Sequence, residues 1–257
     1  MSILFREIVF GPIVSRRLGV SLGINLLPLN GKLCNFDCIY CECGYNRDRR
    51  GDGRLATKEE VLSSLEERLK EHDLSIGEVD SITFSGNGEP TMHPQFGEIV
   101  EGTLKLRDLF ASKAKVSVLT NGSRIGVEEV AEALLKVDNA IIKIDSPYRE
   151  SIEILNRPQY RFSLERMERE LERFKGLFVL QTLFVEGEVD GEEFSNASKQ
   201  EVVEWYSLID RVRPREIMIY TIDRETPAKG LRKISIERLE EIATPLRDRG
   251  YKVTVSG

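Results

Sequence analysis

The stretch Cys34-Asn35-Phe36-Asp37-Cys38-Ile39-Tyr40-Cys41 decides how this sequence is interpreted. Its C-x3-C-x2-C spacing supplies three thiolates to one small site and leaves a fourth coordination position without a protein ligand. A four-iron cluster held in this way keeps one iron open for another molecule, which suits chemistry. The alternative is a zinc site with Cys43 as the fourth thiolate. Zinc usually takes ligand pairs from separate turns, so four thiolates within ten residues would be strained.

Around this stretch, short apolar segments alternate with charged segments of helical periodicity. Near-continuous apolar strands separated by helices indicate a parallel sheet covered by helices. The predicted strands are residues 22–27, 80–85, 115–120, 140–145, 177–184 and 215–220. The predicted helices are residues 58–72, 95–108, 127–136, 163–174, 198–211 and 235–248. Six such units are too few for a closed eight-fold barrel. The predicted fold class is therefore α/β, a partial (β/α)6 TIM-like barrel of parallel strands with its helices outside.

A single domain is expected to cover residues 1–257. In it, residues 1–21 form an N-terminal extension, residues 22–250 the partial barrel, and residues 251–257 a terminal strand. In such folds, ligands gather at the C-terminal ends of the strands and in the loops that follow them. The cysteines occupy the first of these loops, so we expect further functional residues in the others.

The next two predicted strands end in turn residues. The second leads into Ser85-Gly86-Asn87-Gly88-Glu89-Pro90. Its two glycines let the backbone approach a ligand closely, and Glu89 adds a negative charge there. The third leads into Asn121-Gly122, which is a turn signal first and also offers an amide to a ribose or a carboxylate.

The fourth and fifth predicted strands carry polar residues among apolar ones. Lys143 and Asp145 share one face of the fourth strand by the period of two. Two interpretations stay open: an internal ion pair, or a site where Asp145 or Ser146 contacts a cofactor while Lys143 meets the substrate. Gln181, in the fifth strand, needs a hydrogen-bond partner if it is buried, and both a cofactor and the backbone are candidates.

Charge is distributed unevenly along the chain. Residues 1–56 hold eight Lys or Arg against five Asp or Glu, a net charge of +3, and the remainder holds 29 against 38, a net charge of −9. The basic end contains the cysteines. Two interpretations stay open: this end binds an anionic partner near the cysteines, or it is a basic loop that only contacts solvent. The apolar runs fall short of a membrane span, and Met1–Glu7 is no signal peptide. We therefore expect a cytoplasmic protein with no membrane partner.

These motifs resemble the radical S-adenosylmethionine (SAM) superfamily. The resemblance implies a [4Fe–4S] cluster held by Cys34, Cys38 and Cys41, with SAM on the open iron. It further implies a flavodoxin- or ferredoxin-type reductant, and reductive cleavage of SAM to a 5′-deoxyadenosyl radical that abstracts hydrogen from a substrate. The residues expected to contact SAM are Tyr40 near the adenine, Gly86, Gly88 and Glu89 at the methionine end, and Asn121, Asp145, Ser146 and Gln181 at the ribose and carboxylate.

The resemblance extends along nearly the whole chain. With Phe10-Gly11-Pro12-Ile13-Val14-Ser15-Arg16-Arg17-Leu18-Gly19 and Asn156-Arg157-Pro158, the sequence looks like the prokaryotic group related to wyosine tRNA synthetases. Those related enzymes carry a second cluster on three upstream cysteines, and here no cysteine precedes Cys34. We therefore expect a tRNA or nucleotide substrate without that second cluster. The alternatives are an activase that installs a glycyl radical on a partner protein, and a non-catalytic iron–sulfur or zinc protein.

Overall fold

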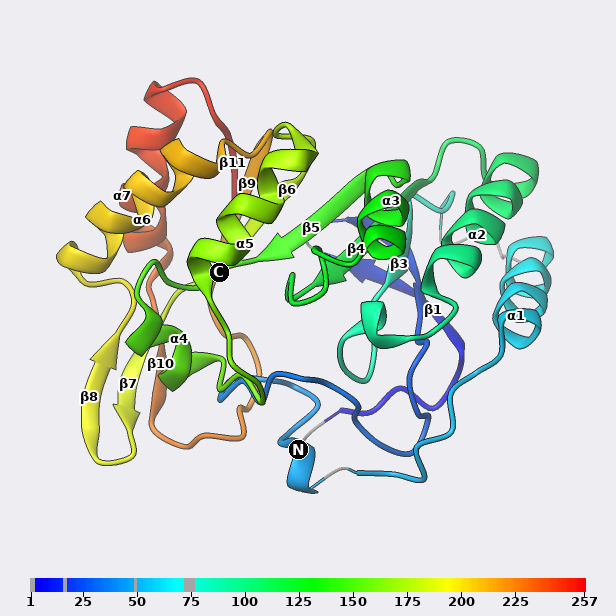
Figure 1. Cartoon of the computed structure of the whole chain (residues 1–257), viewed down its shortest axis with the longest axis horizontal. Helices are drawn as coiled ribbons and strands as arrows, with labels where there is room; N and C mark the ends of the chain where they lie inside the picture. Colours follow the sequence, from blue (N-terminus) through cyan, green and yellow to red (C-terminus); the bar gives the residue numbers. More distant parts are fainter. Residues whose placement is uncertain (1–2, 16–17, 49, 72–76) are drawn as a thin grey trace.

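A computed structural model of the chain describes residues 3–15, 18–48, 50–71 and 77–257 (Figure 1). Its main element is an eight-stranded sheet in the order β1-β2-β3-β4-β5-β6-β9-β11. All pairs from β2 to β11 in this order are parallel, and β1 pairs with β2 in the antiparallel direction. The strands are β1 Val9–Ser15, β2 Gly19–Ile24, β3 Ser81–Phe84, β4 Lys115–Thr120, β5 Asn139–Lys143, β6 Val179–Leu183, β9 Glu216–Tyr220 and β11 Lys252–Ser256.

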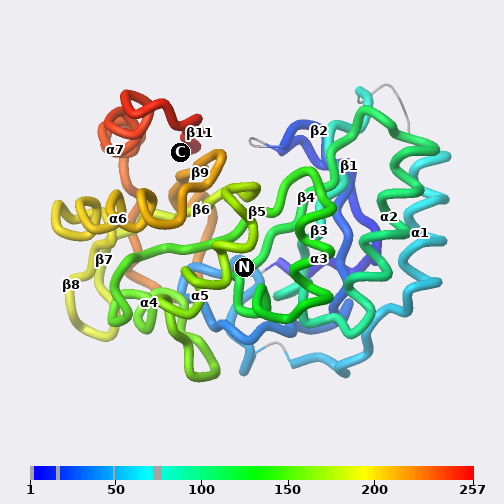
Figure 2. The backbone as a smooth tube through the Cα atoms, turned by 45° about the horizontal axis from the view of Figure 1, so that its top comes forward, coloured from blue at the N-terminus to red at the C-terminus, as the bar shows by residue number. Residues whose placement is uncertain are grey.

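Along each strand, successive side chains point alternately to the outer face of the sheet and to its interior face. In β5, Ile142 packs into the large core under the helices, whereas Ile141 belongs to a small interior cluster with Val179 and Met218. Side chains of successive strand residues point to opposite faces, so Lys143 shares the interior face with Ile141. The sheet curls around this interior as a half-barrel (Figure 2).

Helices cover the outer face of the half-barrel. In Figure 1, α1, α2 and α3 lie beside the strands of the first half, and α6 and α7 lie beside β9 and β11. The helices are α1 Lys58–Lys70, α2 Phe96–Phe110, α3 Glu128–Lys136, α4 Arg149–Leu155, α5 Leu164–Leu171, α6 Lys199–Val212 and α7 Ile236–Asp248. Short 3-10 helices span Asn46–Asp48, Pro90–Met92 and Glu172–Phe174. Among the described residues, no helix has both the length and the apolar character needed to cross a membrane.

The predicted partial barrel of parallel strands with outer helices is confirmed. All six predicted strands have a counterpart, and the terminal strand joins the sheet beside β9. The six predicted helices are also present, although the predicted end of the first, residue 72, lies outside the described residues.

Three features differ from the sequence-based expectation. Part of the predicted N-terminal extension is the edge strand β1, and β2 begins at Gly19. The short helix α4 was not predicted. A second sheet in the order β10-β7-β8, with strands Leu231–Lys233, Val185–Val189 and Glu192–Ser195, was not predicted either. Only Phe184 separates β7 from β6, so the apolar pattern runs from one sheet into the other without a turn signal.

Candidate metal centre

The loop that carries the cysteines follows β2 and runs along the lower edge of the view in Figure 1. Two other loops hold its backbone. On one side, Leu33 forms a parallel bridge with Gly88, where the Leu33 N–H donates to the Asn87 carbonyl at 2.9 Å and the Glu89 N–H donates to the Leu33 carbonyl at 3.1 Å. The glycine-rich turn after β3 therefore lies directly against the cysteine loop.

On the other side, the cysteine loop pairs with the segment that follows α4. The Asp37 N–H donates to the Asn156 carbonyl at 3.0 Å, and the Ile39 N–H donates to the Leu155 carbonyl at 2.9 Å. Phe36 forms an antiparallel bridge with Pro158. Backbone pairing on both sides fixes the positions from which the three thiols project.

Gly86 and Gly88 permit this close packing. Gly88 has a φ of +141°, and a Cβ added there would lie 1.8 Å from the Leu33 carbonyl oxygen. Gly86 has a φ of +125°, and its Cβ would lie 2.5 Å from Oδ1 of Asn25. Both positions require glycine, because other residues rarely adopt a positive φ and the space is occupied. Their predicted contact with the methionine end of SAM stays a prediction.

Hydrogen-bond donors lie next to two of the three thiols, those of Cys34 and Cys38. The Phe36 N–H donates to Sγ of Cys34 at 3.4 Å, and Nδ2 of Asn121 lies 3.9 Å from the same sulfur. Nδ2 of Asn156 lies 3.6 Å from Sγ of Cys38. Donors aimed at sulfur favour the thiolate, which is the form that binds metal.

The thiols differ in how readily they ionise. Burial raises the pKa of Cys34 above its usual range and raises the pKa of Cys38 to about 11. A hydrogen bond from the Cys43 thiol lowers the pKa of Cys41 to about 6, and Lys32 acts in the same direction. Cys34 and Cys38 therefore need a metal to hold them as thiolates.

The fourth cysteine, Cys43, makes hydrogen bonds inside the loop and is not expected to be a metal ligand. Its buried Sγ lies 3.5 Å from the Gly86 carbonyl and within hydrogen-bond reach of Cys41, so its single proton is shared between these two acceptors. The hydrogen bond to Cys41 raises the pKa of Cys43 above its usual range. The thiol thus serves as a donor inside the loop, which fits a site with three cysteine ligands.

Glu89 is buried, and residues of its own chain satisfy its carboxylate. Oε1 accepts from the Thr91 N–H at 3.1 Å, from the Thr91 hydroxyl at 2.6 Å and from the Thr120 hydroxyl at 2.7 Å. Oε2 accepts from the Asn121 N–H at 2.7 Å. Burial raises the pKa of Glu89, and these four hydrogen bonds oppose that rise. The carboxylate therefore links the ends of β3 and β4.

Tyr40 and Asp145 meet in the interior of the half-barrel. The Tyr40 hydroxyl and Nδ2 of Asn156 both donate to Oδ2 of Asp145, the latter at 2.7 Å. Oδ1 of Asp145 accepts from the Leu183 N–H at 2.8 Å and forms an ion pair with Nζ of Lys143 at 3.1 Å. The ion pair that the sequence left open is therefore present, and the Asp145 carboxylate has a partner at each of its lone-pair positions.

Lys143 lies between two tyrosine rings. Its Nζ is 4.9 Å from the centre of the Tyr40 ring and 4.7 Å from that of Tyr220, and it donates to the Tyr220 hydroxyl at 2.6 Å. Burial acts to lower the pKa of Lys143, but the interactions with Asp145 and Tyr220 outweigh it, and the net shift is upward. The amine is therefore held in its charged form next to the cysteine loop.

Ser146 points away from this interior. Its hydroxyl donates to Oε2 of Glu201 on α6 at 2.7 Å and accepts from the Tyr148 N–H at 2.9 Å. Burial raises the pKa of Glu201, and the hydroxyls of Ser146 and Ser151 oppose that rise. The structure thus gives Ser146 a partner on α6, and its predicted contact with SAM has no support in this geometry.

Gln181, unlike Ser146, lies on the interior face of the sheet and has a side-chain donor without a partner. It pairs in register with Lys143 on β5 and Met218 on β9, and it shares the interior face with Val179. The residue is 5% exposed, and its Nε2 has no hydrogen-bond partner. A buried donor without a partner costs about 1–3 kcal/mol. A ligand with an acceptor atom in the half-barrel would remove that cost.

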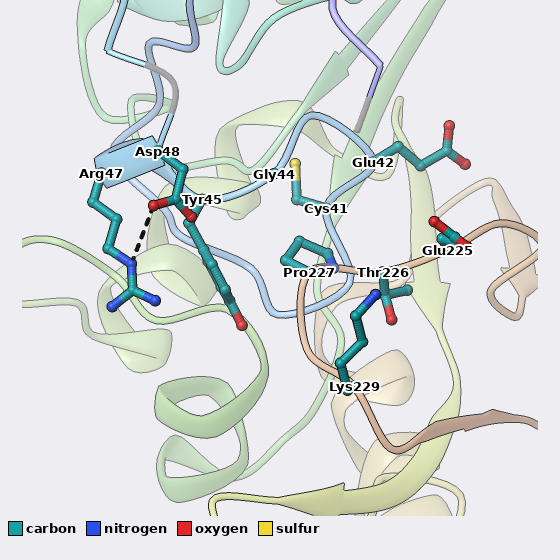
Figure 3. Close-up of a pocket in the computed structure, with 10 residues that line it drawn as sticks. All are labelled: Cys41, Glu42, Gly44, Tyr45, Arg47, Asp48, Glu225, Thr226, Pro227 and Lys229. Carbon is teal, nitrogen blue, oxygen red and sulfur yellow. Dashed lines mark ion pairs between the residues drawn. The ribbon is translucent and has the colours of Figure 1, made fainter. Parts of the chain in front are cut away.

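A pocket of about 440 Å³ opens beside Cys41 (Figure 3). Figure 3 shows Cys41 on one wall, with Arg47 and Tyr45 on a second and Lys229 on a third. Two guanidinium groups lie near the Tyr45 ring, those of Arg47 at 5.4 Å and Arg157 at 5.9 Å from its centre. The pocket lining therefore combines an aromatic ring with charges of both signs, because it contains Glu42, Asp48 and Glu225 as well as Arg47 and Lys229.

The residues present fit a [4Fe–4S] cluster with one open iron. Three thiols come from one loop fixed by backbone pairing, donors from two asparagines reach two of the sulfurs, and the fourth cysteine is used elsewhere. Among the described residues, no three His, Cys, Asp or Glu side chains lie close enough to hold a single metal ion. A cluster places each thiolate on a different iron. The orphaned Gln181 donor in turn fits an acceptor-bearing molecule such as SAM in the half-barrel.

Sequence reasoning assigned no side-chain contact to three residues of this site, although it placed Tyr220 at the start of a loop expected to face the substrate. Lys32 lies buried under the cysteine loop, Asn156 joins Cys38 to Asp145, and Tyr220 contacts Lys143. The Asn-Arg-Pro triplet at 156–158 was noted as part of the resemblance without a role. Its position after a short helix gave no signal that it would pair with a loop more than a hundred residues earlier.

Comparisons with known proteins agree with this architecture. The radical SAM superfamily model matches residues 31–196. A UPF0026 protein from Synechocystis is 30% identical over 247 residues, which are 94% of this chain and 84% of that protein. A GTPase Obg from Brachyspira hyodysenteriae is 28% identical over 238 residues, 91% of this chain and 32% of that protein.

Solved structures share the fold. SuiB from Streptococcus suis, bound to S-adenosylmethionine, aligns with a TM-score of 0.63 at 14% sequence identity, over 90% of this chain and 51% of SuiB. At this identity the likeness extends to the fold alone. The chain spans about a third of the Obg relative and about half of SuiB.

Proposed function

This chain belongs to the radical SAM superfamily and to the UPF0026 proteins, and on that premise we propose that it cleaves SAM reductively at a [4Fe–4S] cluster. Cys34, Cys38 and Cys41 would hold the cluster, which supplies the electron that releases a 5′-deoxyadenosyl radical for hydrogen abstraction. One observation carries the proposal: three thiols, two of them with sulfur-directed donors, lie on a loop locked against the glycine-rich turn after β3. The reductant would be a flavodoxin- or ferredoxin-type protein in the cytoplasm, where free thiols persist.

The other residues of the site would position SAM and exclude water. The backbone of Gly86 and Gly88 would meet the methionine end, while the Glu89 carboxylate, already satisfied by four donors, would hold that turn in shape. Tyr40 and Asp145 would form a rigid wall through their hydrogen bond. Gln181 has an unused donor on the interior face of the sheet, so we assign it a direct contact with an acceptor of SAM or of the substrate.

The substrate that we favour is a tRNA or a nucleotide, in keeping with the likeness to wyosine tRNA synthetases. The observation in its support is the pocket beside Cys41, where Tyr45 can stack on a base and Arg47 can meet a phosphate. Arg157 lies outside the pocket lining but near the Tyr45 ring, where it can meet a second phosphate. A glycyl-radical activase, which would need a protein partner at the same place, is the competing function.

Replacing single cysteines tests the cluster assignment. Cys38→Ala should lose bound iron, the brown colour and SAM cleavage while keeping the far-ultraviolet circular dichroism of the folded protein. Cys43→Ser is the matched control and should retain bound iron, because its thiol donates to the Gly86 carbonyl and a serine hydroxyl can do the same. Retained SAM cleavage in Cys38→Ala, or equal loss of iron in both variants, would contradict the assignment.

Binding of bulk tRNA tests the substrate class. Affinity should fall steeply as salt rises, and it should fall several-fold in a double variant, Arg47→Gln with Arg157→Gln. Arg211→Gln is the control, because Arg211 pairs with Glu168 on the surface of the helices away from the cysteine loop. Salt-independent binding, or equal loss in the control, would contradict an RNA substrate. A stable complex with a large protein partner would favour the activase.

A further inference from the structure

Lys32 is a buried cation beneath the cysteine loop. Its side chain is 1% exposed. Nζ donates to the Gly44 carbonyl at 2.7 Å and lies 3.4 Å from Oδ1 of Asp37, whose own side chain is 17% exposed. No interaction described for the predicted site requires a lysine at this position. Its charge therefore needs a physical explanation.

The partners in the protein compensate this charge only in part. A buried ammonium is stable when it is paired with negative charge and its three donors are satisfied. The distance of 3.4 Å from Nζ of Lys32 to Oδ1 of Asp37 is long for a hydrogen bond, and the same oxygen also accepts from the Asn46 N–H at 2.8 Å. Both partners of Lys32 belong to the cysteine loop: Asp37 directly precedes Cys38, and the Gly44 N–H donates to the Cys41 carbonyl at 2.9 Å. These contacts place the ammonium inside the loop that carries the three ligands of the proposed cluster.

We propose that Lys32 is a positioning residue whose fixed positive charge raises the reduction potential of the cluster held by Cys34, Cys38 and Cys41. The inference rests on the proposed function, because it presupposes that cluster. An oxidised [4Fe–4S] core carries a charge of 2+, so three thiolates bring the site to a net charge of about −1. Reduction adds one electron from an external low-potential donor, moves no proton and brings the site to about −2. A cation within a few ångströms favours the more negative state.

The competing explanation is structural. Lys32 ties the loop together by its hydrogen bond to the Gly44 carbonyl, and that tie alone would account for its burial. Two substitutions distinguish these explanations. Lys32→Gln keeps a hydrogen-bond donor and removes the charge, whereas Lys32→Met removes both. A purely structural role does not change the reduction potential of a cluster that has assembled.

The experiment is a reduction titration of the reconstituted protein, followed by the electron paramagnetic resonance signal of the reduced cluster without SAM. The variants are Lys32→Gln, Lys32→Met and Asp37→Asn, compared with the wild type at one pH and with equal iron content. Both lysine variants should show an equilibrium constant for reduction at least tenfold smaller, which is a shift of about 59 mV to lower potential. Asp37→Asn should shift the potential the opposite way and by less, because it removes the acid nearest the ammonium and this acid is partly exposed.

Each result has one meaning. Potentials equal to the wild type in Lys32→Gln, or a shift confined to Lys32→Met, would overturn the inference in favour of the structural role. If neither lysine variant assembles a cluster, Lys32 is needed for the structure of the loop, and the inference is overturned. Failure of the wild type to assemble any cluster would instead remove the proposed function and this inference with it.

Discussion

The ion pair between Lys143 and Asp145 offers a test of how the interior of the half-barrel is stabilised. The Lys143 side chain is 16% exposed and that of Asp145 is 0% exposed, and their charged atoms lie 3.1 Å apart. Asp145→Asn removes the negative charge and keeps the size of the side chain, including an oxygen that accepts from the Leu183 N–H. The variant therefore leaves a buried ammonium with the Tyr220 hydroxyl and two aromatic rings as its described partners.

The size of the effect follows from this geometry. Removing one partner of a buried ion pair costs about 3–5 kcal/mol, because the other charge stays buried without compensation. The exposed edge of Lys143 and the two tyrosine rings reduce that cost, so we expect about 3 kcal/mol for Asp145→Asn. In the double variant, with Lys143→Met, no uncompensated charge remains. The loss in the double variant should be smaller than the sum of the single losses by about 1.5 kcal/mol or more.

Urea unfolding of the four proteins measures this coupling. A control double-mutant cycle on Arg149 and Glu153, an exposed ion pair one helical turn apart, should give a coupling free energy of no more than about 0.5 kcal/mol. Losses that add within about 0.5 kcal/mol for Asp145 and Lys143 would refute the reasoning, because neighbouring charges that depend on each other are not additive.

Two further predictions concern the turn after β3. Gly88→Ala should abolish cluster loading while leaving most of the helix signal in circular dichroism, because the new methyl group would displace the Leu33 carbonyl; normal iron content in this variant would contradict the close packing. Burial lowers the pKa of His93, so as pH falls below about 6.5 the unfolded chain binds a proton before the folded protein does, and stability should fall until the pH is below the folded pKa. Urea midpoints should fall more between pH 8 and pH 5 in the wild type than in His93→Gln, which keeps the fall that Cys41 contributes through its own lowered pKa. Equal pH dependence in both proteins would assign the effect to another group.

The fold was predictable because its signal is local and repeated. Strands such as β5 and β9 carry short continuous apolar runs, and the helices between the strands keep their periodicity in the sequence. The cysteine spacing and the glycine turn are local as well. The edge strand β1 and the hairpin of β7 and β8 lack such a signal, because their residues are partly exposed and their pairing depends on distant partners.

The roles of individual side chains were less predictable, because they depend on partners that are distant in the sequence. Asp145 and Ser146 are adjacent beyond the end of β5, where the period of two no longer applies, and the structure turns one toward Tyr40 and the other toward Glu201. The contact of Lys32 with the cysteine loop depends on how the loop folds back on itself, which spacing alone does not reveal. Side chains that act across loops become visible only in three dimensions.

The central claim is that this protein cleaves SAM at a cluster held by three cysteines. The most direct test is to reconstitute the protein with iron and sulfide without oxygen, reduce it with SAM present, and assay for 5′-deoxyadenosine. Our account predicts that 5′-deoxyadenosine forms in the wild type and is absent from Cys38→Ala. A wild-type protein that assembles the cluster, accepts an electron and leaves SAM intact with its reductant and tRNA present would contradict the account, as would a protein that binds only zinc.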